Sequence, residues 1–159
     1  MPELQPLRAD HAPALLAFER ENRAYFAATV PDRGEEYFAR FEERLRALLD
    51  DQAAGAGFFH VVTGADGEVL GRVNLYEVTD GSADLGYRIA ERAAGRGLAT
   101  WGVREVCARA AERYGLTVLT ASTTLDNAAS RAVLSRTGFT VVGATRLSGR
   151  PGLSYRRSL

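Results

Sequence analysis

The spacing of apolar residues predicts two helices in the first third of the chain. Residues 12–25 place Leu15 and Phe18 on one side of the first helix. In the second, apolar residues recur at intervals of four, four and three, the pattern of an amphipathic helix: Tyr37, Phe41, Leu45 and Leu48. Gly55 and Gly57 follow this run, and we expect them to end the helix.

The middle of the chain has the pattern of strands joined by tight turns. The stretches FFHVVTG (58–64) and VLGRVNLYEV (69–78) are rich in β-branched and aromatic residues. Asp66 and Gly67 between them form a strong hairpin signal. A further turn, TDGS, leads into a third strand over ADLGYRIA (83–90).

The second half of the chain alternates helices and strands. We expect a helix over 98–114, a β-branched strand in LTVLTAST, a capped helix in LDNAASRAVLSRTGF that ends at Gly138, a strand in FTVVGATRL and a last strand around Ser154. We therefore expect residues 1–159 to form a single α/β domain, in which antiparallel hairpins feed a strand–helix–strand unit. This order predicts a mixed sheet with helices on its faces.

The composition fits one domain and narrows its chemistry. The 159 residues are 46% apolar, which is enough for a full core, and 20 acidic residues balance 20 basic ones. Because the net charge is zero, no general field attracts nucleic acid or a membrane surface, and neither is an expected partner. All the basic residues are arginines, and the chain contains no lysine.

The cysteine and histidine content and the first residues bear on disulfides, metal sites and export. Cys107 is the one cysteine, so we expect no internal disulfide. The chain has only two histidines, His11 and His60, so we also expect no metal site of the His/Cys type. The start, MPELQPLRAD, lacks the basic-then-apolar pattern of a signal peptide, and no apolar run is long enough to span a bilayer. A cytoplasmic location is the expectation.

The stretch RAAGRGLAT (92–100) is the clearest candidate site. Gly95 and Gly97 let the backbone turn tightly and leave N–H groups uncovered. The helix that follows adds unpaired N–H donors and a partial positive charge. Together these features predict a cradle for an anion, most often a phosphate.

Two common phosphate sites fit this stretch poorly. A P-loop needs a lysine after its last glycine, and this chain has none. A dinucleotide fingerprint needs a glycine or alanine where Thr100 stands, and an acid at the end of the next strand, where LTVLTAST has none. The third candidate is the phosphate cradle of enzymes that use acetyl-coenzyme A.

The same stretch resembles the signature of the GNAT acetyltransferases, Gln/Arg-x-x-Gly-x-Gly/Ala, with Arg92, Gly95 and Gly97 on its fixed positions. ADLGYRIA before it resembles the family's fourth strand, and LTASTTLDNAASRAVLSRTGF after it resembles the fifth strand and fourth helix. Within the latter, N-x-x-S-x-x-x-L-x-x-x-G-F, from Asn127 to Phe139, is similar to the RimJ/RimL-like branch, which acetylates protein N-termini and some small amines. The resemblance implies the GNAT fold, a mixed, mostly antiparallel twisted sheet of six or seven strands with about four helices, splayed between strands four and five.

Acetyl-CoA is the cosubstrate that this resemblance implies. Its pyrophosphate would lie against the backbone N–H groups at the start of the helix: Gly95, Arg96, Gly97, Leu98, Ala99 and Thr100. The Arg96 side chain would meet the 3′-phosphate or face solvent.

The resemblance also places the pantetheine arm between the splayed strands. There it would pair with Tyr87, Arg88 and Ile89 like an extra strand. Gly86 would permit the bulge that opens the gap. Asn127 would hold the pantetheine amide from the other side.

Acetyl transfer to an amine sets three requirements. The amine must be neutral to attack, and because α-amino groups have pKa values of about 7.7–8.0, a modest base is enough. Asp84 and Glu77 are the candidates, with solvated strand-end acids as the alternative for both. The developing oxyanion needs a donor, for which the N–H group of Tyr87 or Arg88 is the candidate.

The departing thiolate is the third requirement, because it gains from a proton or a hydrogen bond. Many GNAT enzymes use a tyrosine seven residues after the asparagine, but that position is Leu134 here. Ser130 matches the RimL-like pattern and is our candidate for general acid or thiolate hydrogen-bond donor. The alternative is a serine that only caps or packs the helix.

The acceptor stays open between two classes of primary amine. The resemblance favours a protein or peptide N-terminus, and a small amine such as an antibiotic, polyamine or amino acid is the alternative. In this family the loop between the first two helices, ENRAYFAATVPDRGEE (21–36), borders the acceptor. A CoA-binding sensor without catalysis is a further alternative, which the missing tyrosine supports, and a homodimer is possible because relatives in this branch often form one.

Overall fold

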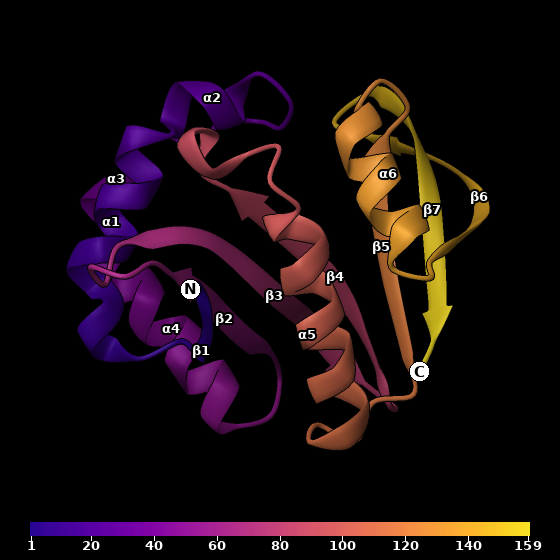
Figure 1. The fold of residues 1–159 in the computed structure, drawn as a ribbon, viewed down its shortest axis with the longest axis horizontal. Coiled ribbons are helices and arrows are strands. Elements are labelled where there is room, and N and C mark those ends of the chain that lie inside the picture. Colours follow the sequence, from indigo (N-terminus) through magenta and orange to yellow (C-terminus); the bar gives the residue numbers. More distant parts are fainter.

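The computed structural model describes residues 1–159 as one seven-stranded sheet with helices on both faces (Figure 1). The strands are β1 (Glu3–Pro6), β2 (Phe58–Thr63), β3 (Val69–Thr79), β4 (Ser82–Ile89), β5 (Val118–Thr124), β6 (Thr140–Leu147) and β7 (Arg150–Ser158). The helices are α1 (Ala12–Glu21), α2 (Arg23–Ala27), α3 (Glu35–Ala39), α4 (Phe41–Ala53), α5 (Leu98–Glu112) and α6 (Ala128–Arg136). The strand order is β1-β2-β3-β4-β5-β7-β6, and only the β4–β5 pair is parallel. The mixed, mostly antiparallel sheet is thus confirmed.

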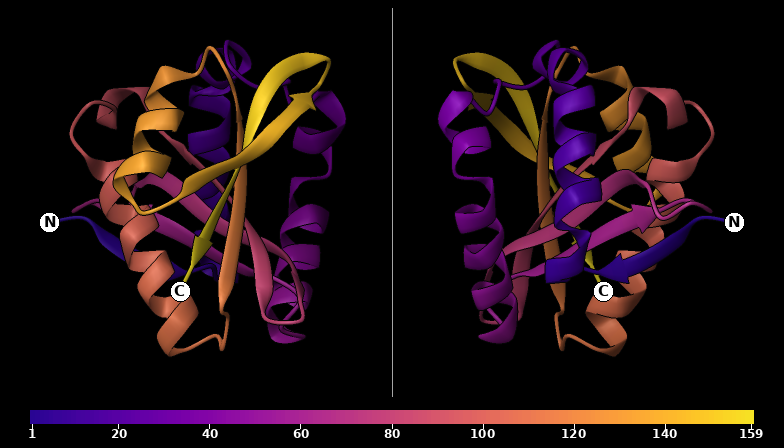
Figure 2. Two further views of the ribbon diagram at one scale, coloured as in Figure 1. Left: turned by 90° about the vertical axis from the view of Figure 1, so that its right-hand side faces the viewer. Right: turned by 90° about the vertical axis from the view of Figure 1, so that its left-hand side faces the viewer.

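The helices divide the core into two clusters, one on each face of the sheet. On one face α1 and α4 pack over β2 and β3, and on the other α5 and α6 cover the centre of the sheet (Figure 2). Val61 and Val62, adjacent on β2, belong to different clusters because successive side chains of a strand point to opposite faces. The same alternation decides which groups on β4 meet each other in the site.

Both helices expected in the first third are interrupted, so the fold has six α-helices rather than about four. The predicted helix over 12–25 divides into α1 and α2 at Asn22. The Asn22 side chain explains the break, because its Nδ2 donates to Phe18 O at 2.9 Å while its Oδ1 accepts the Glu91 N–H at 3.0 Å. The second helix divides into α3 and α4 at Arg40, and Gly55 follows its end with a φ of 74°.

Strand β1 is the element that the apolar pattern does not predict. It has four residues, and Leu4 is its one buried side chain. An alternation this short gives no periodic signal. It pairs with β2 from Glu3 to Pro6 and so forms one edge of the sheet.

The sheet is splayed between β4 and β5, as the resemblance implied. The two strands pair only where Ser82, Ala83 and Asp84 meet Val118, Leu119 and Thr120. Beyond this point β4 continues beside β3, whereas β5 follows β7 as far as Thr124 (Figure 1). The second half of β4 therefore has a partner strand on one side only.

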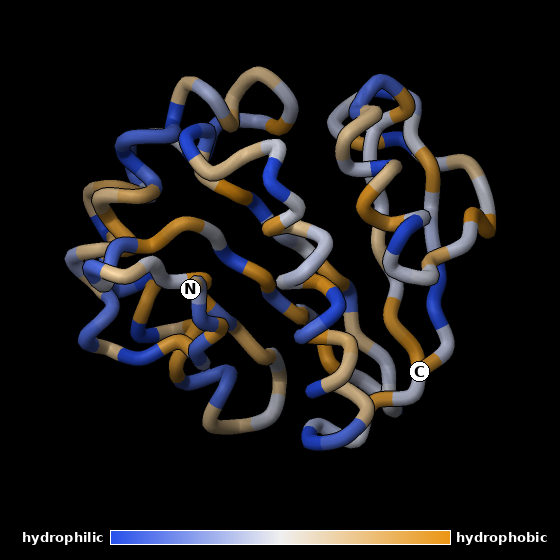
Figure 3. The backbone as a smooth tube through the Cα atoms, viewed as in Figure 1, coloured by the Kyte–Doolittle hydropathy of each residue, from blue (hydrophilic) through white to orange (hydrophobic).

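The far edge of the sheet, β6, exposes apolar side chains. Val141 and Val142 are 53% and 60% exposed, and the outermost strand in Figure 3 carries this apolar colour. No helix in the structure has the length and apolar character needed to cross a membrane.

Candidate active site

The glycine-rich loop before α5 presents a run of unused backbone donors. Gly95 and Gly97 have φ angles of 77° and 75°, a conformation that favours glycine. No backbone N–H group from Gly95 to Thr100 donates to a protein acceptor, and the α5 N-cap, Gly97, supplies no side-chain cap. Six consecutive donors at a helix N-terminus form a cradle that fits a phosphate group.

The segment before this loop is held by neighbouring contacts, while the arginine side chains beside the cradle are free. The short 3₁₀ turn before it, Glu91–Ala93, is bonded to α1 through Asn22, and Ala93 is buried. The exposed side chains of Arg92 and Arg96 make no hydrogen bond or salt bridge. Both guanidinium groups are therefore available to an anion in the cradle.

Every second backbone N–H group of β4 points into the gap between β4 and β5. The Ala90 N–H donates to Leu70 O at 2.8 Å, and the β3–β4 register runs unbroken from there to Asp84. Because hydrogen-bonded pairs alternate in an antiparallel ladder, Gly86 and Arg88 bond β3. The N–H groups of Leu85, Tyr87 and Ile89 consequently face β5. Of the two oxyanion donors considered from sequence, this geometry supports Tyr87 and not Arg88.

The bulge expected at Gly86 is wrong. The β3–β4 register shifts between Tyr76 and Thr79, where Glu77 has a φ of 53°, and is regular at Gly86. A Cβ atom at Gly86 would lie 3.0 Å from Cε2 of Tyr76, so the glycine makes room for that ring. The gap opens because β5 turns away to pair with β7.

The Tyr87 side chain crosses the gap and meets Ser130. Its hydroxyl donates to Ser130 Oγ at 3.1 Å and joins β4 to the first turn of α6. Burial raises the pKa of Tyr87, and the bond to Ser130 opposes the rise, so the phenol is protonated at neutral pH. Sequence reasoning assigned Tyr87 only a backbone role, and no local spacing relates it to a serine on another element.

Asn127 and Leu134 set the other side of the gap. Asn127 is the N-cap of α6, where its Oδ1 accepts the Ser130 N–H at 3.2 Å, and its Nδ2 has no protein acceptor. An amide of a bound arm could therefore be held only through that Nδ2. Leu134, which stands where many relatives have a tyrosine, is buried in the core cluster of α5 and α6.

Asp84 and Glu77 lie close together at the end of the gap. Thr120 Oγ1 donates to Asp84 Oδ1 at 2.8 Å across the last β4–β5 pair. Burial raises the pKa of Asp84, and the nearby Glu77 charge adds to the rise. The half-buried Asp84 is therefore not a solvated strand-end acid, whereas Glu77 is exposed. A carboxylate of raised pKa suits a general base.

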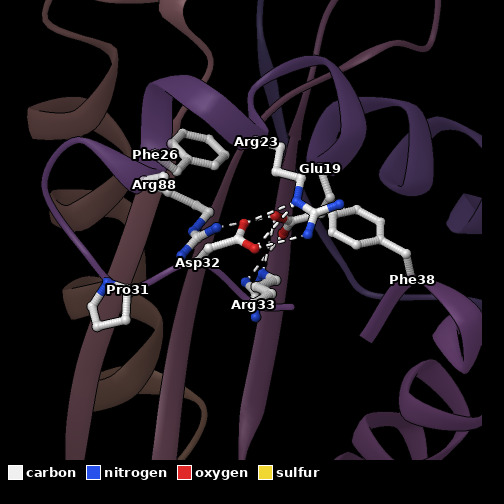
Figure 4. A pocket seen from close by; sticks show the side chains of 9 residues that line it. Glu19, Arg23, Phe26, Pro31, Asp32, Arg33, Phe38 and Arg88 are labelled. Carbon is white, nitrogen blue, oxygen red and sulfur yellow. Dashed lines mark hydrogen bonds and ion pairs between the residues drawn. The ribbon is translucent and has the colours of Figure 1, made fainter. Parts of the chain in front are cut away.

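The opposite face of β4 carries a charged cluster that sequence reasoning missed. Glu19 of α1 is buried and accepts hydrogen bonds from three arginines that come from three segments of the chain. Figure 4 shows Glu19 with two of them, Arg33 and Arg88. The distances are 2.7 Å to Arg72 Nη1 of β3, 3.0 Å to Arg88 Nη1 of β4, and 3.1 Å to Arg33 Nε of the loop before α3. Burial alone would raise the pKa of Glu19, but the three guanidinium groups hold it below its usual value.

His60 and Cys107 have structural surroundings. His60 is buried on β2, where its ring bonds Val73 O at 2.9 Å and the Tyr114 hydroxyl at 2.6 Å. Burial lowers the pKa of His60 to about 4. Cys107 is buried in the core between α5 and the sheet.

Known proteins with this fold and sequence pattern are acetyltransferases. The family model described as acetyltransferase (GNAT) domain matches residues 3–140. A ribosomal-protein alanine acetyltransferase from Vibrio fischeri superposes with a TM-score of 0.93 at 18% identity, covering 99% of this chain and 92% of the other. RimJ of Mycobacterium smegmatis in complex with a CoA-disulfide gives 0.87 at 24% identity, covering 99% and 81%.

A polyamine enzyme is also structurally similar. A spermidine N-acetyltransferase SpeG chimera from Vibrio cholerae gives a TM-score of 0.82 at 19% identity, covering 99% of this chain and 95% of the other. A search of curated protein sequences found no match to the chain.

Proposed function

The chain belongs to the GNAT acetyltransferase family and is an N-acetyltransferase, and from this premise we propose that it acetylates the α-amino group of a peptide or protein N-terminus. The observation that carries the use of acetyl-CoA is the run of six uncommitted N–H donors beside the open edge of β4. The N-terminal acceptor is supported by the Asn127–Phe139 pattern and by the similarity to ribosomal-protein acetyltransferases over 99% of the chain.

Acetyl-CoA fits the groups around the gap. The proposed cradle is Gly95–Thr100 for the pyrophosphate, with Arg92 and Arg96 available to the phosphates. The arm would lie along Tyr87–Ile89 and pair with the free N–H group of Ile89, which leaves the N–H group of Tyr87 for the acetyl carbonyl. Asn127 Nδ2 would donate to the arm from α6.

In the proposed reaction the neutral amine attacks the thioester carbonyl, and the C–S bond then breaks. Asp84 takes the amine proton, directly or through water, because its raised pKa makes it a better base than an exposed carboxylate. Glu77 is the rival base and lies on the same side of the gap. The N–H group of Tyr87 donates to the oxyanion.

Ser130 and Tyr87 together stabilise the departing thiolate in this proposal. Ser130 Oγ accepts the hydrogen bond of Tyr87, so its own hydroxyl proton is free to point at the sulfur. Chained hydroxyl donors polarise each other, which makes this pair a better donor than a lone serine. The Tyr87–Ser130 pair thus provides here, through the Ser130 hydroxyl, the hydrogen bond to sulfur that a tyrosine at the position of Leu134 provides in many relatives.

A small polyamine is the second candidate acceptor. Its support is the similarity to a spermidine N-acetyltransferase chimera, with a TM-score of 0.82 against 0.93 for the ribosomal-protein alanine acetyltransferase and 0.87 for RimJ. The two acceptors differ in charge beyond the reacting amine, since spermidine carries further cations.

Calorimetry followed by a thiol-release screen tests the function. We expect acetyl-CoA to bind in the micromolar range, and CoA to be released when peptides with free N-termini are added. Binding without release from peptides, spermidine or amino acids would instead indicate a CoA-binding sensor. Because the chain has no lysine, acetyl-lysine on the enzyme cannot complicate the assay.

A further inference from the structure

The arginine cluster around Glu19 has more positive charge than its one carboxylate neutralises. Arg33, Arg72 and Arg88 all bond Glu19, which leaves two positive charges in excess. Arg23 and Asp32 line the same pocket (Figure 4). Arg23 is paired with both Asp32 and Glu35, so this second group has one negative charge in excess. The two groups together have a net charge of +1, and the positive charge lies on the three arginines that share Glu19.

Two of these arginines reach solvent with unused donors. The side chains of Arg33 and Arg88 are 27% and 20% exposed, against 4% for Arg72. Arg88 uses only Nη1 for a protein acceptor, and Arg33 uses Nε and Nη2. Arg88 Nε and Nη2 and Arg33 Nη1 are left for a ligand.

Aromatic rings fix the direction of both guanidinium groups. Arg88 lies over Phe26 with its Cζ 4.4 Å from the ring centroid, and Arg33 lies over Tyr37 at 4.5 Å. Stacking and the Glu19 bonds hold these donors in place before any ligand arrives, so binding costs little side-chain entropy. Burial and repulsion from Arg33 lower the pKa of Arg88, which an added anion would relieve.

The cluster lies where an acceptor meets the reacting end of the gap. Tyr87 turns toward Ser130, so the next residue, Arg88, and the earlier Asp84 point to the opposite face of β4. Gly86 and Arg88 lie two residues apart on that face, roughly 7 Å. A peptide whose N-terminal amine lies between Asp84 and Gly86 would thus have its second or third residue over Arg88.

We infer that Arg33 and Arg88 form a subsite for a carboxylate on the acceptor, so that the acceptor is an amine with an acidic group one or two residues from its N-terminus. This inference rests on the proposed function and narrows it to a substrate class. The surplus positive charge, with the unused donors of Arg33 and Arg88, attracts a carboxylate and repels the additional ammonium groups of a polyamine.

Matched acceptors test the subsite by CoA release. The probes are Ala-Asp-Ala-Ala and Ala-Asn-Ala-Ala, both amidated at the C-terminus, with free alanine and spermidine. We expect kcat/KM to be about tenfold higher for the acidic peptide than for its neutral partner, and lowest for spermidine. Free alanine separates the two sources of a carboxylate, because its own lies too close to the amine to reach Arg88.

The variant Arg33→Gln should remove most of this preference. It leaves Glu19 bonded to Arg72 and Arg88, so the fold keeps its buried ion pair. We expect kcat/KM to fall about tenfold for the acidic peptide relative to the neutral one, so that the ratio between the two peptides approaches one. Arg20→Gln is the matched control, since Arg20 is exposed on α1 and makes no salt bridge or hydrogen bond.

Binding separates the subsite from catalysis. Calorimetry of the acidic peptide against CoA-saturated protein should show affinity that Arg33→Gln lowers, even if no acceptor is acetylated; that combination would sink the proposed acetylation and keep the subsite. Three results would overturn the subsite while acetyl transfer stands. They are equal kcat/KM for the two peptides, better turnover of spermidine than of the acidic peptide, and no effect of Arg33→Gln on either CoA release or peptide affinity.

Discussion

The two faces of β4 use different chemistry. The face toward α5 and α6 has Ala83, Leu85 and Tyr87, and its polar groups are backbone N–H donors and neutral hydroxyls. The face toward α1 and α2 has Asp84 and Arg88, and three arginines meet a buried carboxylate beside it. In the proposed reaction, the edge of β4 beside the first face holds the cosubstrate through backbone N–H groups, and the other face selects the acceptor by charge. A single strand would then separate the part of the reaction common to the family from the part specific to the acceptor.

Removing the carboxylate of the charged face should have the largest effect, a loss of folding stability. In Glu19→Gln the buried Arg72 loses its counter-charge, so we expect the free energy of unfolding to fall by about 3–5 kcal/mol. Urea denaturation measures this loss. Glu21→Gln on the same helix is the control, because Glu21 is exposed and bonds nothing. Equal stability of the two variants would mean that the cluster is not a structural unit.

Breaking the backbone face should abolish cosubstrate binding and leave the fold intact. Gly97→Glu places an anion and a strained φ in the cradle, and we expect at least 100-fold weaker acetyl-CoA binding by calorimetry. Gly115→Glu, at the other end of α5, introduces the same residue at a φ of 68° with open space around it. Equal acetyl-CoA affinities for the two variants would show that this loop does not bind the pyrophosphate.

The neutral hydroxyl pair offers a smaller test of the same face. Ser130→Ala should lower kcat by about 10- to 100-fold and leave acetyl-CoA affinity nearly unchanged, because the α6 cap uses the Ser130 backbone and not its hydroxyl. Tyr87→Phe should lower kcat less, since Ser130 keeps its proton. Ser135→Ala, exposed on the same helix, is the control. Unchanged turnover in Ser130→Ala would exclude the hydroxyl from the reaction.

The smallest expected effect is the loss of stability when His60, buried on the α5 side of the sheet, becomes protonated. The pKa of His60 is lowered from 6.5 to about 4, so the unfolded chain binds a proton more readily than the folded one. Stability present above pH 6.5 is then lost as pH falls toward 4, by about 1–2 kcal/mol between pH 7 and pH 5. Denaturation at the two pH values measures it. His60→Gln should show a smaller loss, and an equal one would assign it to other groups.

Local features of the sequence predicted the conformation of the glycine-rich loop. Gly95, Gly97 and the start of α5 are adjacent in the chain, and their conformation depends on glycine and on the helix end. The strands from 58 to 90 and the helix α6 also follow from short-range patterns. The break at Asn22 could not be predicted, because its side chain bonds Glu91, which is 69 residues away in the chain.

The sequence by itself therefore determined the family pattern, the mixed sheet and the cradle, all of which depend on neighbouring residues. Only the tertiary structure decided that Tyr87 meets Ser130, 43 residues away, and that Arg88 meets Glu19, 69 residues away. Strand pairing and the alternation of side chains across β4 set those meetings, and no spacing along the chain encodes them. A backbone site can be predicted from a short motif, while a charge cluster exists only once distant strands and helices pack together.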